Sequence, residues 1–132
     1  MARTLRIPSD LGAAQQAEDE LLEEVARYGY TEASTFAIKL AVEEALNNAI
    51  KHGNGFDGSK KVELTFDVSD ERAVVSVTDQ GEGFVPDRLP DPTADENLEK
   101  PTGRGVMLMR AYMDDVRFND KGNQVQLTKK NS

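Results

Sequence analysis

A carboxylate, an amide and an ammonium group are spaced along one short stretch of this chain, at Glu44, Asn48 and Lys51. At about 100° per residue in an α-helix, Asn48 lies roughly 40° to one side of Glu44 around the helix axis, and Lys51 lies roughly 20° to the other side of Glu44. The three side chains are therefore expected to converge on one edge of the helix. The positions that continue this edge backwards are apolar: Ala37, Leu40 and Ala41. The polar group is therefore local. An acidic base, a metal-ligand oxygen and a phosphate-reaching cation at this spacing suit a site for a magnesium-bound nucleotide.

Composition limits what such a site can belong to. A chain of 132 residues suits one domain with a single core. Sixteen basic and twenty-four acidic residues give a net charge of −8, which disfavours binding to nucleic acid or to anionic lipid. Cysteine is absent, and no segment approaches the roughly 20 apolar residues that span a bilayer. We therefore expect a single cytoplasmic domain over 1–132, with proteins and small molecules as partners, no direct contact with nucleic acid and no membrane.

Hydrophobic patterning predicts the elements that must position the cluster. The N-terminal half reads as an edge strand at 4–7 ended by Pro8, a helix capped by Ser9 or Asp10, and a long central helix from Thr31 to Gly53. Strands follow at 62–68 and 73–78, then a helix at 105–113 and a hairpin with strands at 116–118 and 125–128. This order predicts an α/β fold of the α+β type: a two-layer sandwich with a mixed, mostly antiparallel sheet and the helices on one face.

The segment between the predicted strand at 73–78 and the predicted helix at 105–113 has a different composition. From 85 to 102 the chain combines several prolines with acidic residues and has few apolar side chains. This composition predicts a long loop with one helical turn near 93–98. Long loops inside a small domain are usually functional. We expect a lid over the site.

Two glycine motifs flank this loop. Asp79 follows a predicted strand and precedes Gly81 and Gly83, so its carboxylate can accept hydrogen bonds from a ring and its exocyclic amine while the glycines let the backbone approach a flat base. A plain turn is the alternative. Gly103, Arg104 and Gly105 stand before the next helix, whose N–H groups and dipole attract phosphate; a flexible loop base with a solvated arginine is the alternative there.

Other polar or polarisable residues have simpler interpretations. His52 is the only histidine, and a helix-terminal histidine that satisfies a carbonyl group is the alternative to a ligand contact. Glu44 and Asn48 taken singly are typical of solvated helix positions. The methionines of the last predicted helix fit a role as core filler: Met107, Met109 and Met113.

Taken in order, the segments Glu44–Gly53, Asp79–Phe84 and Gly103–Gly105 resemble the N, G1 and G2 boxes of the GHKL, or Bergerat-fold, ATPase superfamily. The segment Tyr112–Val116 is similar to the bacterial anti-sigma-factor serine kinases, whose ATP-binding domain has a histidine-kinase-like fold. The combination is far more specific than any one of the boxes. It covers almost the whole chain and implies ATP and Mg²⁺ as cofactors.

The resemblance also implies roles for single residues. Glu44 would be the general base that accepts the proton of a substrate serine, and Asn48 would hold Mg²⁺. Lys51 would reach the phosphates, His52 and Gly53 would line the nucleotide pocket, and Asp79 would bind the adenine amine. The remaining implied contacts are Gly81 and Gly83 beneath the base, Gly103, Arg104, Gly105, Val106 and Met107 around the phosphates, and Thr128 near adenine through water.

By the same resemblance, the chain is expected to be an ATP-dependent serine/threonine protein kinase that acts as an anti-sigma factor. It would hold a sigma factor or a similar effector and phosphorylate a serine of an anti-anti-sigma-type protein. Two copies would pair through the N-terminal strand and helix. Three alternatives stay open: an ATP-binding module that sequesters a partner without significant kinase activity, the catalytic half of a histidine kinase, which needs a phospho-acceptor other than His52, and an interaction domain without a nucleotide.

Overall fold

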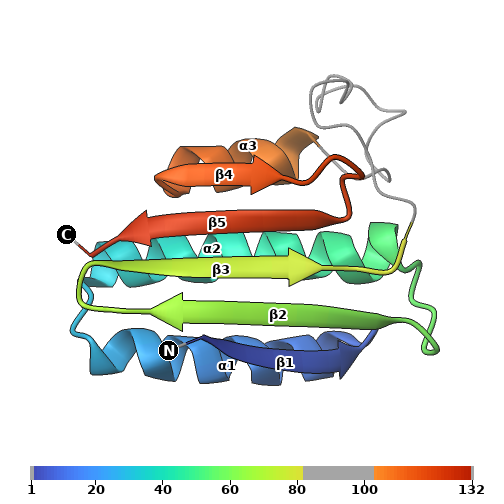
Figure 1. Cartoon of the computed structure of the whole chain (residues 1–132), viewed down its shortest axis with the longest axis horizontal. Helices are drawn as coiled ribbons and strands as arrows, with labels where there is room; N and C mark the ends of the chain where they lie inside the picture. Colours follow the sequence, from blue (N-terminus) through green and yellow to red (C-terminus); the bar gives the residue numbers. More distant parts are fainter. Residues whose placement is uncertain (1, 82–102, 132) are drawn as a thin grey trace.

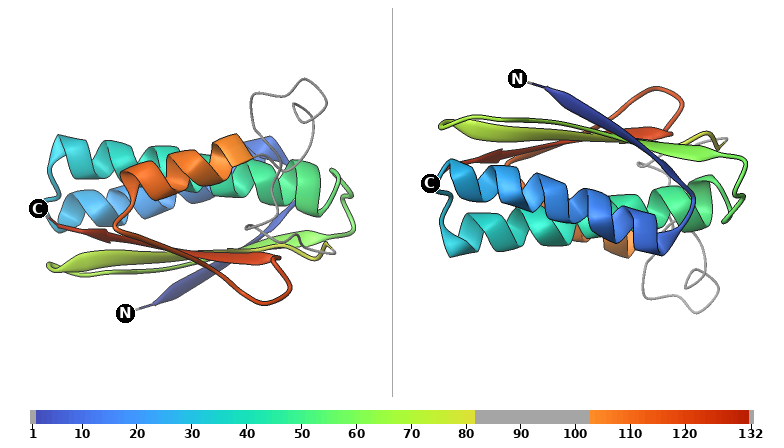
Figure 2. Two further views of the ribbon diagram at one scale, coloured as in Figure 1. Left: turned by 90° about the horizontal axis from the view of Figure 1, so that it is seen from above. Right: turned by 90° about the horizontal axis from the view of Figure 1, so that it is seen from below.

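The computed structural model describes residues 2–81 and 103–131 and arranges them in two layers (Figure 1). One layer is a sheet of strands in the order β1-β2-β3-β5-β4, with bounds β1 Arg3–Pro8, β2 Lys61–Val68, β3 Arg72–Thr78, β4 Asp115–Phe118 and β5 Gln124–Lys130. Every described ladder is antiparallel. The other layer holds three helices, α1 Leu11–Arg27, α2 Glu32–Asn48 and α3 Gly103–Tyr112, all on one face of the sheet (Figure 2). The predicted fold class is confirmed, and the described sheet is wholly antiparallel.

Local sequence signals set where the first two helices begin. The side chain of Asp10 accepts a hydrogen bond from the N–H of Ala13, and that of Thr31 accepts one from the N–H of Ser34. Both are N-cap contacts, which satisfy donors that the first turn of a helix cannot pair internally. Asp10 is thus the cap of α1. Ser9 instead donates its hydroxyl to the carbonyl oxygen of Lys60, 2.8 Å away, and so links the start of α1 to the start of β2.

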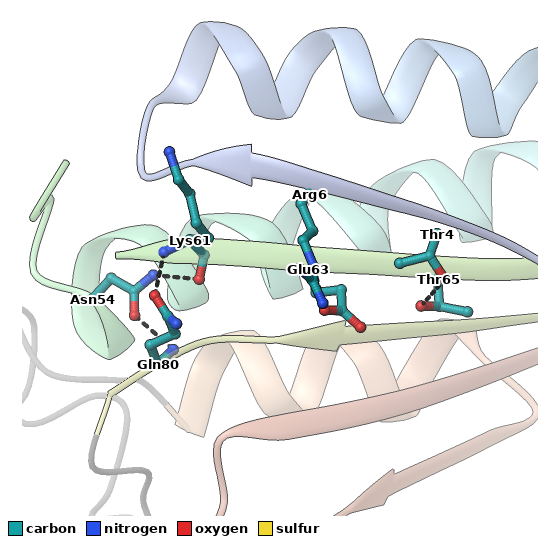
Figure 3. Close-up of polar contacts among 7 residues, drawn as sticks. All are labelled: Thr4, Arg6, Asn54, Lys61, Glu63, Thr65 and Gln80. Atoms are coloured by element: carbon teal, nitrogen blue, oxygen red, sulfur yellow. Dashed lines mark hydrogen bonds and ion pairs between the residues drawn. The ribbon is translucent and has the colours of Figure 1, made fainter. Parts of the chain in front are cut away.

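The core lies between the two layers and follows the alternation of the strands. In β2 the apolar residues Val62, Leu64, Phe66 and Val68 are buried against the helices. Their neighbours face the other side, where Thr4 and Thr65 share a hydrogen bond of 3.0 Å and Arg6 pairs with Glu63 at 3.1 Å (Figure 3). The outer face of the sheet is therefore polar. This one-sided burial fixes the register, since a slip of one residue would exchange the two faces.

The central helix ends differently from its prediction. Regular α-helix stops at Asn48, and residues Ala49–Gly53 form one turn of π-helix. The N–H of Asn54 donates to the carbonyl oxygen of Ala49, five residues back, at 2.8 Å. Such single π-turns are frequent at functional sites. Helical periodicity carried past Asn48 therefore assigns the wrong direction to the side chains that follow.

Three sequence predictions fall outside the described residues. They are Gly83, the lid at 85–102 and the helical turn near 93–98. Within 2–81 and 103–131, none of the helices is both long enough and apolar enough to cross a bilayer.

Candidate functional site

A cavity of about 370 Å³ opens at the end of the sheet where α2 passes into the π-turn. This size is within the usual range for small-molecule sites, which runs from about 300 to 1,000 Å³. Its walls come from segments far apart in the sequence: the end of α2, the turn after it, the end of β3, α3 and the hairpin before β5. The side chains and glycines that form the walls include Asn48, His52, Gly53, Asn54, Lys60, Asp79, Gly81, Met109, Asn123 and Gln124.

Asp79 is the acidic group of this cavity. Its backbone is fixed on both sides: its N–H donates to the carbonyl oxygen of Asn123 at 2.9 Å, and its own carbonyl oxygen accepts from the Asn123 amide at 3.0 Å. One carboxylate oxygen accepts the N–H of Gly81 at 2.7 Å. Burial raises the pKa of Asp79, against the hydrogen bond from Gly81 and the positive charges of Lys121 and Lys60. A ligand that donates hydrogen bonds to this carboxylate would relieve part of the cost of its burial.

Two glycines make room for that carboxylate. A Cβ atom added to Gly53 would overlap the Asp79 carboxyl group, with Oδ1 at only 2.6 Å. A Cβ added to Gly81 would overlap the backbone of Gly53, 2.6 Å from its carbonyl carbon. Since real Cβ contacts are not this short, the π-turn and the end of β3 can meet at this distance only with glycine at both positions. Gly53, Asp79 and Gly81 therefore form a single cradle.

Asn54 holds the cradle together and was not singled out by the sequence analysis. It is only 3% exposed. Its amide nitrogen donates to Ser9 Oγ at 3.0 Å. The same nitrogen donates to the carbonyl oxygen of Lys61 at 3.0 Å, and Oδ1 accepts the N–H of Gln80 at 2.8 Å (Figure 3). The side chain of Gln80 in turn accepts the N–H of Lys61. One buried amide thus ties the π-turn to β2 and to the residue after Asp79.

We expect Asn54→Ala to lower the free energy of unfolding by about 3 kcal/mol, because it removes three hydrogen bonds and leaves buried groups unpaired. Urea denaturation measures this change. Asn131→Ala is the control, since the Asn131 amide donates only to the carbonyls of Tyr28 and Asp70, away from the cavity. A loss no larger for Asn54 than for Asn131 would show that Asn54 does not hold the cradle together.

Of the predicted cluster Glu44, Asn48 and Lys51, only Asn48 lines the cavity. Asn48 lines the cavity and Glu44 is half-buried on α2, whereas the Lys51 side chain is exposed and does not line the cavity. Lys51 lies within the π-turn, where each residue advances by a smaller angle around the axis than in an α-helix. The π-turn therefore changes the direction in which the Lys51 side chain leaves the helix. It brings His52 into the cavity wall instead.

His52 and Lys60 add nitrogen groups to the cavity wall. Burial lowers the pKa of His52, with a further contribution from the positive charge of Lys51, so the neutral imidazole is favoured. A neutral imidazole offers one donor and one acceptor. Lys60 is half-buried and lines the cavity directly. Its position was not predicted, because its flanking sequence reads only as a turn before a strand.

Helix α3 begins at Gly103, two residues before its predicted start, so Gly103, Arg104 and Gly105 form its first turn. Val106 is buried, and Met109 reaches the cavity wall. Met107 is 59% exposed, whereas Met109 and Met113 are buried. The prediction that all three methionines fill the core was therefore wrong for Met107. A ten-residue helix has a positive N-terminal end, which attracts anions.

The structure does not bring Thr128 to the cavity. Side chains alternate along a strand, and Leu127 of β5 is buried in the core, so Thr128 points to the outer face of the sheet. It pairs there with Val74 and Asp115. Asn123 and Gln124, at the start of the same strand, line the cavity instead. The sequence signal that could have identified them is the turn before the strand, since loop residues next to a buried strand end can reach a ligand.

The chain matches a family model and several known proteins. A family model described as the histidine kinase-like ATPase domain matches residues 7–129. The serine-protein kinase RsbW of Bacillus subtilis is 36% identical over 112 residues, a match that covers 78% of this chain and 69% of that protein. The RsbW of Oceanobacillus iheyensis is 29% identical over 101 residues, 72% of this chain and 64% of that protein. The anti-sigma F factor of Clostridium perfringens is 34% identical over 99 residues, 70% of each chain.

A solved structure shares the fold. The crystal structure of the RsbU and RsbW domains of a Mycobacterium tuberculosis protein superposes with a TM-score of 0.67 at 17% sequence identity. The match covers 98% of this chain and 31% of that one. At this identity the likeness concerns the fold alone. The chain spans about two thirds of the length of the curated relatives, from 64% to 70%.

Proposed function

The chain belongs to the histidine kinase-like ATPase domain family, and from this premise we propose that the cavity at the end of α2 binds ATP. One observation carries the proposal: the Gly53, Asp79 and Gly81 cradle presents a partly desolvated carboxylate in a cavity of about 370 Å³. The exocyclic amine of adenine is a donor that suits this carboxylate. The absence of Cβ atoms lets a planar base approach the backbone.

The chain is a protein serine kinase that acts as an anti-sigma factor. Its resemblance to serine-protein kinase RsbW and to anti-sigma F factor supports this assignment. In the cytoplasm it holds a sigma factor or a similar effector, and an anti-anti-sigma-type protein releases that effector. Phosphorylation of a serine in the anti-anti-sigma-type protein restores the hold. Two copies of the chain pair through β1 and α1.

Different residues would bind the adenine and the phosphates of ATP. Asp79 binds the adenine amine, with Gly81 beneath the base and His52 and Gly53 in the wall. The family resemblance adds Gly83, which lies outside the described residues, beneath the base. The first turn of α3, with Gly103, Arg104, Gly105, Val106 and Met107, binds phosphate oxygens at its positive end. Lys51 is exposed within the π-turn and would reach the phosphates from the solvent side.

Asn48 would hold Mg²⁺ when the nucleotide is bound. An amide oxygen is a ligand type that Mg²⁺ accepts, and the ion takes most of its other ligands in nucleotide sites from phosphate and water. When bound, Mg²⁺ supplies positive charge that neutralises the phosphate oxygens. Asn48 lines the cavity, which supports this role.

Glu44 is the general base. It is half-buried on α2, one turn before Asn48. Its carboxylate takes the proton of the substrate serine hydroxyl while the serine oxygen forms the new bond to the γ-phosphorus. The bond between the γ-phosphorus and the bridging oxygen breaks at the same time, and ADP leaves with that oxygen.

The experiment that tests the function uses the purified chain with ATP labelled in the γ-phosphate, Mg²⁺ and a set of anti-anti-sigma-type proteins. We expect transfer of the label to a serine of at least one of them, and none when that serine is alanine. Binding of ATP with no transfer to any protein in the set would overturn the kinase assignment and favour sequestration without catalysis. Failure to bind ATP at all would overturn the proposal as a whole.

A further inference from the structure

A second cavity, of about 270 Å³, lies between α1 and α2. Helix α2 runs between α1 and α3, so this cavity is on the opposite flank of α2 from α3 (Figure 1). It combines two carboxyl groups, two amides and three apolar side chains: Leu11, Ala14, Gln15, Glu18, Glu43, Leu46 and Asn47. None of these residues lines the nucleotide cavity.

Glu18 is the unusual member of this set. It is 1% exposed, and its Oε1 has no hydrogen-bond partner among the described residues. A buried acceptor without a donor is costly, so a carboxyl group in this position needs an explanation. The other charged groups that act on Glu18 are Asp19 on α1 and Glu43 and Lys39 on α2.

Glu43 further disfavours the ionised form of the Glu18 carboxyl group. A hydrogen bond with Glu43 and the negative charge of Glu43 add to burial, and together they raise the pKa of Glu18 to about 7. The pKa of Glu43 itself is lowered, chiefly by a hydrogen bond from Lys39. The Lys39 ammonium lies 2.8 Å from Oε1 of Glu43. That pair is partly exposed and leaves Oε1 of Glu18 without a hydrogen-bond partner among the described residues.

We propose that this cavity receives the guanidinium group of an arginine side chain from a partner protein. Charge complementarity supports the choice, because two carboxyl groups meet there on a chain of net charge −8. The amide nitrogen of Gln15 already donates to Asp19 at 3.0 Å, so its carbonyl oxygen is the group it can offer to a donor. The apolar side chains of Leu11, Ala14 and Leu46 suit the methylene stem of an arginine.

An arginine fits better than a lysine. A guanidinium carries five N–H donors in a planar fork and is more weakly hydrated than an ammonium, so it can serve several acceptors inside a partly buried cavity. An ammonium is already supplied to Glu43 by Lys39 without reaching Oε1 of Glu18. The partner therefore inserts a group that the chain itself does not provide there.

The test is an NMR titration of the whole chain, with glutamate side-chain carboxyls labelled, against N-acetyl-arginine amide as the probe. We expect saturable shifts at Glu18 and Glu43, and stronger binding above neutral pH than below it, because the Glu18 carboxyl ionises near pH 7. Glu18→Gln keeps the shape of the side chain and should weaken binding by about tenfold or more, since it removes a charge-assisted hydrogen bond. Glu23→Gln makes the same change at an exposed position of α1 and should leave binding unchanged.

Several results would overturn the proposal. The first is the absence of saturable shifts, and the second is equal binding by Glu18→Gln and the unaltered chain. Equal or tighter binding of N-acetyl-lysine amide would remove the preference for guanidinium. Binding of free arginine but not of the capped probe would indicate a small metabolite instead of a protein side chain. The titration contains no nucleotide, so its outcome is independent of the kinase assignment.

Discussion

Glu44→Gln should slow phosphate transfer to the substrate serine by about 100- to 10,000-fold, the usual contribution of a positioned general base. Glutamine keeps the size and polarity of the side chain but cannot accept the proton of the attacking hydroxyl. ATP affinity should be nearly unchanged, because Glu44 is not among the residues that line the cavity. Single-turnover transfer of labelled phosphate measures the first quantity, and calorimetric titration with ATP measures the second.

Glu32→Gln is the matched control for Glu44. It makes the same chemical change at an exposed position in the first turn of the same helix. The control should transfer phosphate at the normal rate. Transfer by Glu44→Gln at a rate close to that of the control would remove Glu44 from its role as the base, while the nucleotide site itself would stand.

Gly81→Ala is expected to weaken ATP binding by about tenfold to a hundredfold and to destabilise the fold. The added Cβ would overlap the carbonyl group of Gly53, which belongs to the backbone and cannot move without displacing the π-turn. Overpacking of this kind costs about 1–3 kcal/mol, and each 1.4 kcal/mol corresponds to about tenfold in an equilibrium constant. Calorimetry with ATP and thermal unfolding measure the two effects.

Gly58→Ala is the control for this variant, since a Cβ at Gly58 meets no atom within 4 Å. It should bind ATP as the unaltered chain does and unfold at a similar or higher temperature, because alanine restricts the unfolded chain. If Gly81→Ala and Gly58→Ala bound ATP equally well, close approach at the cradle would not be needed for the nucleotide.

The layered fold could be predicted because its signals are local and repeated. Alternation in β2, the caps at Asp10 and Thr31 and the turn before β5 each determine one element without reference to distant residues. The resemblance to the GHKL family is confirmed by the match of the family model to 7–129. Asp79 and Gly81 could be selected in the same way, because a carboxylate and glycines after a buried strand form a short motif.

The direction of single side chains could not be predicted where the helix changes its geometry. Lys51 was assigned to the edge of Glu44 and Asn48 by α-helical angles, and the π-turn from Ala49 to Gly53 invalidates those angles. Hydrophobic periodicity and capping residues do not distinguish a π-turn from the last turn of an α-helix. The exposure of Met107 has a similar origin, since a ten-residue helix has an outer side that apolar residues can also occupy.

Contacts between segments far apart in the chain also could not be predicted from the sequence. Asn54 reads as a turn residue beside glycine, yet it is buried and bonded to Ser9, Lys61 and Gln80. Its partners are up to 45 residues away along the chain. The family resemblance implies a place for Thr128 near adenine, whereas the register of β5 turns its side chain to the outer face. Both cases require the pairing of strands, which a single sequence does not specify.

The central claim, that ATP binds in the cavity beside Asp79, is tested most directly by a crystal structure of the chain with a non-hydrolysable ATP analogue and Mg²⁺. We predict purine density against Gly81 with its amine hydrogen-bonded to the Asp79 carboxylate, and a metal ion bound to Asn48. Purine density at another place on the molecule, or a cavity that stays free of nucleotide at saturating analogue, would contradict the account.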